Sequence, residues 1–158
     1  MKRISARQKL KPGESEEDYM DRYYDHKHKD YIGEQPDWAK LKEKLLSLGG
    51  KYVAMNLEED MDKLLSRGKS WPTSNIRLMK GRPISCHSNT ADLYEQNPTT
   101  STIVTGWVLG PNDEIWRQHT WLWFKPKNQL IETTIKRKAY FGFELSKSEA
   151  KMFCEENW

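Results

Sequence analysis

The stretch from Thr102 to Ile135 constrains the fold more than any other part of this 158-residue chain. Three strand-like runs, rich in β-branched and aromatic residues, lie at 102–109, 115–124 and 129–135. The two segments between them, Gly110 to Asp113 and Lys125 to Asn128, have the composition of tight turns. This spacing predicts consecutive hairpins and therefore an antiparallel sheet.

Helical patterns surround the expected sheet. Apolar residues recur at three- and four-residue spacing in several segments, and these predict helices at about 14–31, 36–48, 57–67 and 86–96. Asn56 and Ser85 are expected to cap the third and fourth of them, and Ser146 with Glu149 predicts a capping box at the start of a last helix. Tyr140 to Phe143 is expected to add a final strand.

The expected fold class is therefore α+β. N-terminal helices and a cysteine-bearing helix would pack on an antiparallel sheet, in one domain covering residues 1–158. Residues 1–13 are basic, end at Pro12-Gly13 and are expected to form a flexible arm.

Composition excludes several classes of function. The 26 basic and 23 acidic residues leave a net charge of only +3, which makes a nucleic-acid-binding surface unlikely. Apolar runs are too short for a membrane span or a signal peptide, and two distant cysteines do not form a disulfide framework. The expected location is the cytoplasm, or the host-cell cytoplasm if the chain is phage-encoded.

Cys86 is the first candidate for chemistry. A Gly-Arg-Pro turn precedes it, and Ser85 as cap would place the thiol in the first turn of a helix. Unpaired N–H groups and the helix dipole stabilise a thiolate at that position, and the same groups can donate to an oxyanion. The alternative is a small buried cysteine without reactivity.

His119 and Glu132 are the second and third candidates. If Phe124 pairs with Gln129 across the second turn, His119 and Glu132 lie diagonally on one face of the hairpin, about 7–8 Å apart between backbones. A register shift of one residue would separate them. Alternatively, Glu132 forms an ordinary salt bridge and His119 is a core histidine.

Three motifs also carry a family resemblance. A Cys-His-x-Asn segment at 86–89, a Trp-Arg-Gln-His strand at 116–119 and an Ile-Glu-Thr-Thr strand at 131–134 resemble a group of bacterial and phage proteins. Their order is similar to that of the papain-like superfamily, which includes transglutaminase-like, NlpC-type and arylamine acetyltransferase-like enzymes. The resemblance covers roughly residues 64–143 and implies a papain-like fold with Cys86, His119 and Glu132 as the catalytic set. Papain-like enzymes usually have Asn or Asp where this chain has Glu132.

The resulting hypothesis is a thiol-dependent acyl-transfer enzyme, either a hydrolase or a transferase, that needs no cofactor and no metal. Cys86 would attack an amide or ester, such as one in a protein or peptide, while Glu132 orients His119. Oxyanion stabilisation or support is expected from Asn89 and Gln118. The substrate cleft is expected to include Trp116, Arg117 and Trp121.

Two rival functions remain open from the sequence. The first is a binding protein on the same fold, with an idle cysteine, that contacts a host protein or nucleic acid. The second is a metal site built from Cys86, His87, His119 and Glu132. Adjacent cysteine and histidine residues rarely bind the same zinc ion, and the set lacks close-spaced pairs, so the acyl-transfer hypothesis, without a metal, is preferred to this alternative.

Overall fold

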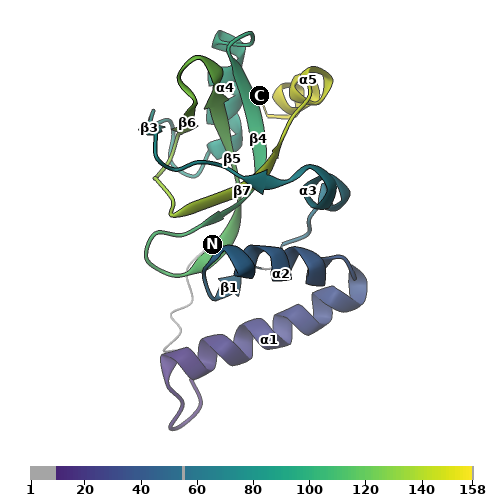
Figure 1. Ribbon diagram of the computed structural model, residues 1–158. Coiled ribbons are helices and arrows are strands. Elements are labelled where there is room, and N and C mark those ends of the chain that lie inside the picture. Colours follow the sequence, from purple (N-terminus) through teal and green to yellow (C-terminus); the bar gives the residue numbers. More distant parts are fainter. Residues whose placement is uncertain (1–9, 55, 158) are drawn as a thin grey trace.

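A computed structural model describes residues 10–54 and 56–157 of the chain and has a mixed α+β architecture (Figure 1). Its five α-helices are α1 (Glu16–Glu34), α2 (Trp38–Leu48), α3 (Met61–Arg67), α4 (Cys86–Gln96) and α5 (Lys147–Glu156). None of the helices in the described part of the chain has the length and apolar character that a membrane crossing requires.

The strands form one mostly antiparallel sheet. They are β1 (Tyr52–Val53), β2 (Lys69–Ser70), β3 (Ile76–Leu78), β4 (Ser101–Leu109), β5 (Ile115–Phe124), β6 (Gln129–Glu132) and β7 (Ala139–Glu144). The strand order is β2-β7-β4-β5-β6-β3, and β1 pairs separately with β5. Among the described strands, only the short β1 and β3 pair in parallel, with β5 and β6 respectively.

Strand β5 positions the candidate site because only part of one of its edges is paired. Along the opposite edge, β4 pairs with β5 from Trp116 to Phe124. On the candidate-site edge, β1 covers Ile115 and Trp116, and β6 covers Leu122 to Phe124. Within the described residues, the stretch 117–121 has no strand partner there, so backbone groups of β5 are open to other contacts.

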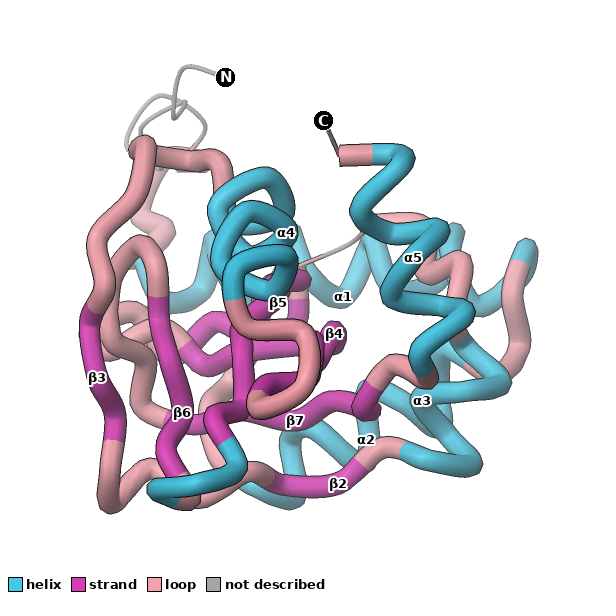
Figure 2. Tube along the Cα trace, turned by 90° about the horizontal axis from the view of Figure 1, so that it is seen from above, coloured by secondary structure: helices cyan, strands magenta, loops and turns pink. Residues whose placement is uncertain are grey.

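The two faces of the sheet bury different clusters. On one face, α2 and α3 pack on Trp107, Trp116 and neighbouring side chains. Farther along the same face, α4 and α5 pack on Ile103, Leu122 and Ile131. Figure 2 shows α4 and α5 side by side over the sheet.

The second face buries a separate cluster that includes Trp71, Val104, Trp121, Leu130 and Tyr140. The segment that follows β2 covers this face, because Trp71 packs there and its indole N–H donates to the Gly142 carbonyl at 3.0 Å. Because alternate residues of a strand point to opposite faces, His119 and Glu132 belong to this second face.

A pair of glycines allows β4 and β7 to approach closely behind the candidate site. Gly106 lies opposite both His119 on β5 and Gly142 on β7. A Cβ atom on Gly142 would lie 2.5 Å from the Thr105 carbonyl oxygen and 2.9 Å from the Trp121 ring. Both distances are shorter than normal van der Waals contact, so these positions require glycine.

The α+β class, the antiparallel hairpins and the pairing of Phe124 with Gln129 are confirmed. The capping box of Ser146 and Glu149 is confirmed as well. The third helix begins at Met61 rather than after Asn56, and Asp60 occupies its N-cap position. The Ser85 side chain does not cap α4 but donates to the Pro83 carbonyl at 3.2 Å.

One expectation falls partly outside the described residues, and two short strands were not predicted from the sequence. Residues 1–9 of the expected arm are outside the described part of the chain. Strands β2 and β3 fall in a segment, 69–83, that the sequence pattern identified only as irregular. Both strands are short and mostly exposed, so they lack the alternating apolar pattern that reveals a strand.

Candidate active site

Cys86 is the first residue of α4, as the sequence predicts. The first intrahelical bond joins the Asn89 N–H to the Ser85 carbonyl at 2.8 Å, so the N–H groups before it lack helical acceptors. The thiol is half-buried and free of any disulfide. The side chain of His119 and the backbone N–H of Thr120, on the open stretch of β5, stabilise its charged form and lower the pKa of the thiol.

His119 lies between the thiol and a buried carboxylate. Its Nε2–H donates to Glu132, with distances of 2.8 Å to Oε1 and 3.0 Å to Oε2. Because Nε2 is occupied in this way, Nδ1 is the ring nitrogen that remains for Cys86. The side chains of His119 and Glu132 are almost completely buried, with 4% and 0% of their surface exposed. The order thiol, imidazole, carboxylate is the arrangement found in catalytic triads.

Glu132 is held by donors beyond His119. The Tyr140 hydroxyl donates to Oε2 at 2.8 Å, while the backbone N–H and the hydroxyl of Thr134 donate to Oε1 at 3.1 and 2.9 Å. Tyr140 is oriented in turn by the backbone N–H of Arg137, which donates to its oxygen at 3.0 Å. These donors fix the carboxylate in position and favour its charged form.

The electrostatics favour a thiolate–imidazolium pair. Burial alone would raise the pKa of Cys86, but the hydrogen bond and charge of His119 outweigh it and lower the pKa of the thiol. Burial opposes charge on His119 too, yet Cys86 and Glu132 together raise the pKa of the imidazole. For Glu132, burial is outweighed by His119, Tyr140 and Thr134, and the pKa of the carboxyl is lowered. Burial and the neighbouring Glu132 raise the pKa of Tyr140, which keeps its hydroxyl protonated as a donor.

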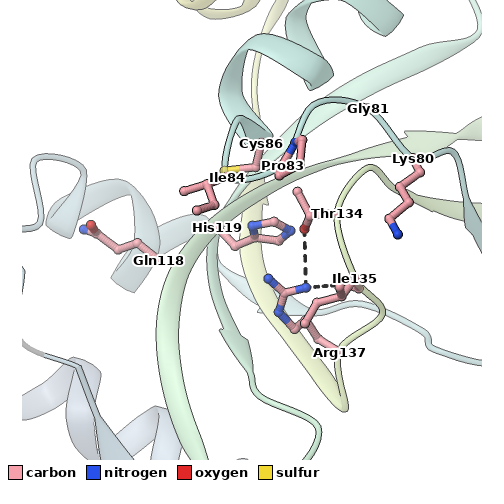
Figure 3. Close-up of a pocket in the computed structure, with 10 residues that line it drawn as sticks. All are labelled: Lys80, Gly81, Pro83, Ile84, Cys86, Gln118, His119, Thr134, Ile135 and Arg137. Carbon is pink, nitrogen blue, oxygen red and sulfur yellow. Dashed lines mark hydrogen bonds between the residues drawn. The ribbon is translucent and has the colours of Figure 1, made fainter. Parts of the chain in front are cut away.

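A cavity of about 390 Å³ opens onto Cys86 and His119. Two loops form its sides: one leads into α4 and contributes Lys80, Gly81, Pro83 and Ile84, and the other follows β6 and contributes Thr134, Ile135 and Arg137 (Figure 3). Ile84 is fully exposed and has a positive φ of 56°. A β-branched residue rarely adopts this conformation, and such strain concentrates at functional sites.

The residues expected to support an oxyanion have other partners. Asn89 is buried, and its amide accepts from the Arg82 N–H at 3.1 Å and donates to the Arg82 carbonyl at 2.8 Å. It therefore holds the loop before Cys86. Gln118 donates to the Leu57 carbonyl and to Glu58 at 2.9 and 3.0 Å, and Figure 3 shows its amide turned away from His119. Neither amide group is placed to donate beside the sulfur.

The three residues expected in the substrate cleft do not line the cavity beside Cys86. Trp116 is completely buried in the cluster under α2 and α3, and its indole donates to the Gly49 carbonyl at 2.8 Å. Arg117 forms an ion pair with Asp113 at 2.7 Å and does not line the cavity. Trp121 is buried behind the site, where its ring stacks on His119 with 6.3 Å between centroids and meets Tyr140 edge-on.

The four residues of the rival metal site do not gather around one point. His87 is exposed and packs edge-on against Phe153 of α5, with 5.5 Å between ring centroids. Among the residues that the structure describes, no three His, Cys, Asp or Glu side chains form a cluster that could hold a metal ion.

Sequence reasoning missed Tyr140, Thr134, Arg137 and the Thr120 N–H. The Tyr140 contact depends on how β7 folds back over the hairpin, which no local pattern encodes. Thr134 could have been found, because residues 132 and 134 lie on the same face of the expected strand, which brings the hydroxyl beside the carboxylate.

Comparisons with protein-family models, with curated proteins and with solved structures gave no match for this chain.

Proposed function

We propose that this protein is a thiol-dependent acyl-transfer enzyme with a papain-like arrangement of Cys86, His119 and Glu132. The observation that carries the proposal is the buried imidazole of His119, which donates to Glu132 through Nε2 and leaves Nδ1 for the thiol. A cavity opens on the Cys86 and His119 side of this arrangement, so a substrate carbonyl can reach the sulfur.

The reaction follows from these positions. The Cys86 thiolate attacks the carbonyl carbon of an amide or ester, and the negative charge passes to the carbonyl oxygen. The N–H groups in the first turn of α4 lack helical acceptors and would donate to that oxyanion. When the C–N or C–O bond breaks, the Nδ1 proton of His119 goes to the leaving amine or alcohol, and the acyl group remains as a thioester on Cys86.

The second half of the reaction regenerates the enzyme. His119 takes a proton at Nδ1 from water or from an acceptor amine or alcohol, which attacks the thioester carbon. The C–S bond breaks, and Cys86 leaves as thiolate beside the imidazolium. Water makes the enzyme a hydrolase, and another acceptor makes it a transferase. Throughout, Glu132 keeps its charge, orients the ring and stabilises the imidazolium.

The proposal is tested by alkylation of Cys86 with iodoacetamide as a function of pH, followed by mass spectrometry of the two cysteine peptides. The thiolate is the reacting species, so Cys86 should be labelled well below pH 8. Cys154 is buried in α5, and burial raises the pKa of its thiol, so it should react later.

His119→Ala should raise the labelling pH of Cys86, whereas Cys154→Ala should leave it unchanged. If Cys86 in the wild-type protein reacts only where an ordinary thiol does, the enzyme proposal fails. The binding-protein function with an idle cysteine then takes its place.

A further inference from the structure

The charge around the cavity is much more one-sided than the charge of the whole chain. Five of the 26 basic residues lie in the two loops that form the cavity sides, and two of them, Lys80 and Arg137, line the cavity itself. The other three are Arg82, Lys136 and Lys138. These loops, 79–85 and 133–138, contain no acidic residue, and the nearest ones in the sequence are Asp92 on α4 and Glu132 at the end of β6. A net charge of +3 for the chain therefore conceals a local concentration of positive charge.

Two of these cations line the cavity from opposite sides. Figure 3 shows Lys80 extending from the loop before α4, and the Arg137 guanidinium turned toward Thr134. Arg137 donates to the Thr134 hydroxyl at 3.4 Å and to the Ile135 carbonyl, which are neutral acceptors. These contacts orient the planar guanidinium, and its remaining N–H groups can bind an anion in the two-point manner typical of arginine.

These cations have no acidic partner in the described part of the chain. No ion pair joins Lys80 or Arg137 to a carboxylate there, whereas Arg117 on the same strand as His119 is paired with Asp113. Asp92 lines an adjoining cavity together with Lys80 but lies outside the one that reaches the thiol. No Asp or Glu lines the cavity among the described residues, and Glu132 is buried where it accepts from His119.

We infer that the substrate is anionic: an amide or ester that carries a carboxylate or phosphate group within a few bonds of the attacked carbonyl, held between Lys80 and Arg137. This inference rests on the proposed function and adds the chemical class of the substrate to it. A cleft lined by charges of one sign concentrates ligands of the opposite sign and accelerates their association. The exposed Ile84 and Ile135 at the same opening supply an apolar contact for the rest of the substrate.

The test uses three alkylating probes that share one reactive group. The probes are N-iodoacetyl derivatives of ethanolamine, β-alanine and O-phosphoethanolamine, which differ only in a hydroxyl, carboxylate or phosphate at the end of an ethyl tail. The iodinated carbon is the same in all three probes. The rate of Cys86 alkylation by an anionic probe, divided by the rate with the neutral probe, therefore measures the preference of the protein for the charged group. The rates are measured by mass spectrometry at low ionic strength on the full chain.

The expected result is faster alkylation by at least one anionic probe than by the neutral one, with the faster of the two identifying the preferred group. In Lys80→Gln/Arg137→Gln, the anionic-to-neutral ratio should fall by about three- to tenfold. Because the ratio is taken within each variant, a change in the intrinsic reactivity of the thiol cancels from it. Raising the salt concentration to about 0.5 M should lower the wild-type ratio in the same direction.

Two variants control for total charge and for the shape of the arginine. Lys125→Gln/Lys127→Gln removes the same charge from the exposed turn between β5 and β6 and should leave the ratio unchanged. Arg137→Lys keeps the charge and should retain most of the ratio.

The outcomes separate this inference from the proposed function. Suppose that Cys86 reacts with the neutral probe below pH 8, but that Lys80→Gln/Arg137→Gln has the same anionic-to-neutral ratio as the control variant Lys125→Gln/Lys127→Gln. The inference of an anionic substrate is then wrong, and the enzyme proposal stands. If Cys86 shows no enhanced reactivity with any probe, the proposed function fails and this inference fails with it.

Discussion

Glu132→Gln is the most informative single substitution because it keeps the shape of the side chain and removes only its charge. The carboxylate contacts the His119 ring directly at 2.8 Å, and both groups are buried. An adjacent opposite charge shifts a pKa by about 1–3 units, so the imidazolium should lose its proton at lower pH in the variant. The thiolate then lacks its charged partner at neutral pH.

A weaker effect works in the opposite direction. Glu132 also repels the Cys86 thiolate, which raises the pKa of the thiol slightly. The carboxylate touches the imidazole, whereas the ring separates it from the sulfur, so the loss of imidazolium stabilisation should dominate. We expect the pH of half-maximal iodoacetamide labelling of Cys86 to rise by about 1–2 units, equivalent to about 1.4–2.7 kcal/mol.

The same substitution should change stability in a defined pH window. The lowered pKa of Glu132 means that its contribution is present above the unfolded value of 4.5 and is lost as the pH falls through the folded value. The raised pKa of His119 means that its contribution is present below the unfolded value of 6.5 and is lost as the pH rises through the folded value. The difference in free energy of unfolding between wild type and Glu132→Gln should therefore be largest between about pH 4.5 and 6.5.

Urea denaturation across pH 4–9, together with the labelling profile, checks both expectations. A labelling profile that is unchanged in Glu132→Gln but abolished in His119→Ala would refute the role assigned to the carboxylate. A stability difference that does not depend on pH would show that Glu132 acts through packing and neutral hydrogen bonds rather than through its charge.

Three further substitutions test the surroundings of the site. Tyr140→Phe removes one donor from Glu132 and leaves the Arg137 N–H without its acceptor, so urea denaturation should show a loss of about 1–2 kcal/mol; no loss would mean that water replaces the hydroxyl. Gly142→Ala forces a Cβ against Thr105 and Trp121 and should cost about 2–3 kcal/mol, whereas Gly33→Ala, with nothing within 4 Å, should not lower stability. Ile84→Gly relieves the positive φ and should raise the free energy of unfolding by up to about 1 kcal/mol; a clear loss would contradict the strain argument.

The hairpin at the centre of the fold was predictable because two local rules agree there. Alternation along β5 places Trp121 and His119 on one face, and the turn at Lys125 to Asn128 fixes the pairing of Phe124 with Gln129. The position of Glu132 beside His119 follows from that register alone. The position of Cys86 at the start of α4 was predictable for a similar reason, because glycine and proline at 81 and 83 disfavour a helix interior before it.

The rest of the site could not be read from local patterns because it depends on contacts between distant segments. Tyr140 reaches Glu132 only because β7 pairs with β4, which is not adjacent to it in the chain. Gln118 and Asn89 have the chemistry of oxyanion donors, but Glu58 and the Arg82 backbone occupy them. Trp116 was expected in the cleft although alternation along β5 already places it on the face opposite to His119, so this error was avoidable from the sequence.

The hairpin of β5 and β6 also has a consequence for the order in which the molecule folds. His119 and Glu132 are separated by 13 residues and meet within one hairpin, and contacts of short sequence separation form early. Cys86 lies on α4, before β4 begins, and reaches β5 only when the helix docks at its open edge. The imidazole and carboxylate should therefore assemble before the nucleophile arrives, and a partly folded chain would not yet pair Cys86 with His119. Pulse-labelling of Cys86 during refolding measures this directly: enhanced thiol reactivity should appear no earlier than the native tryptophan fluorescence.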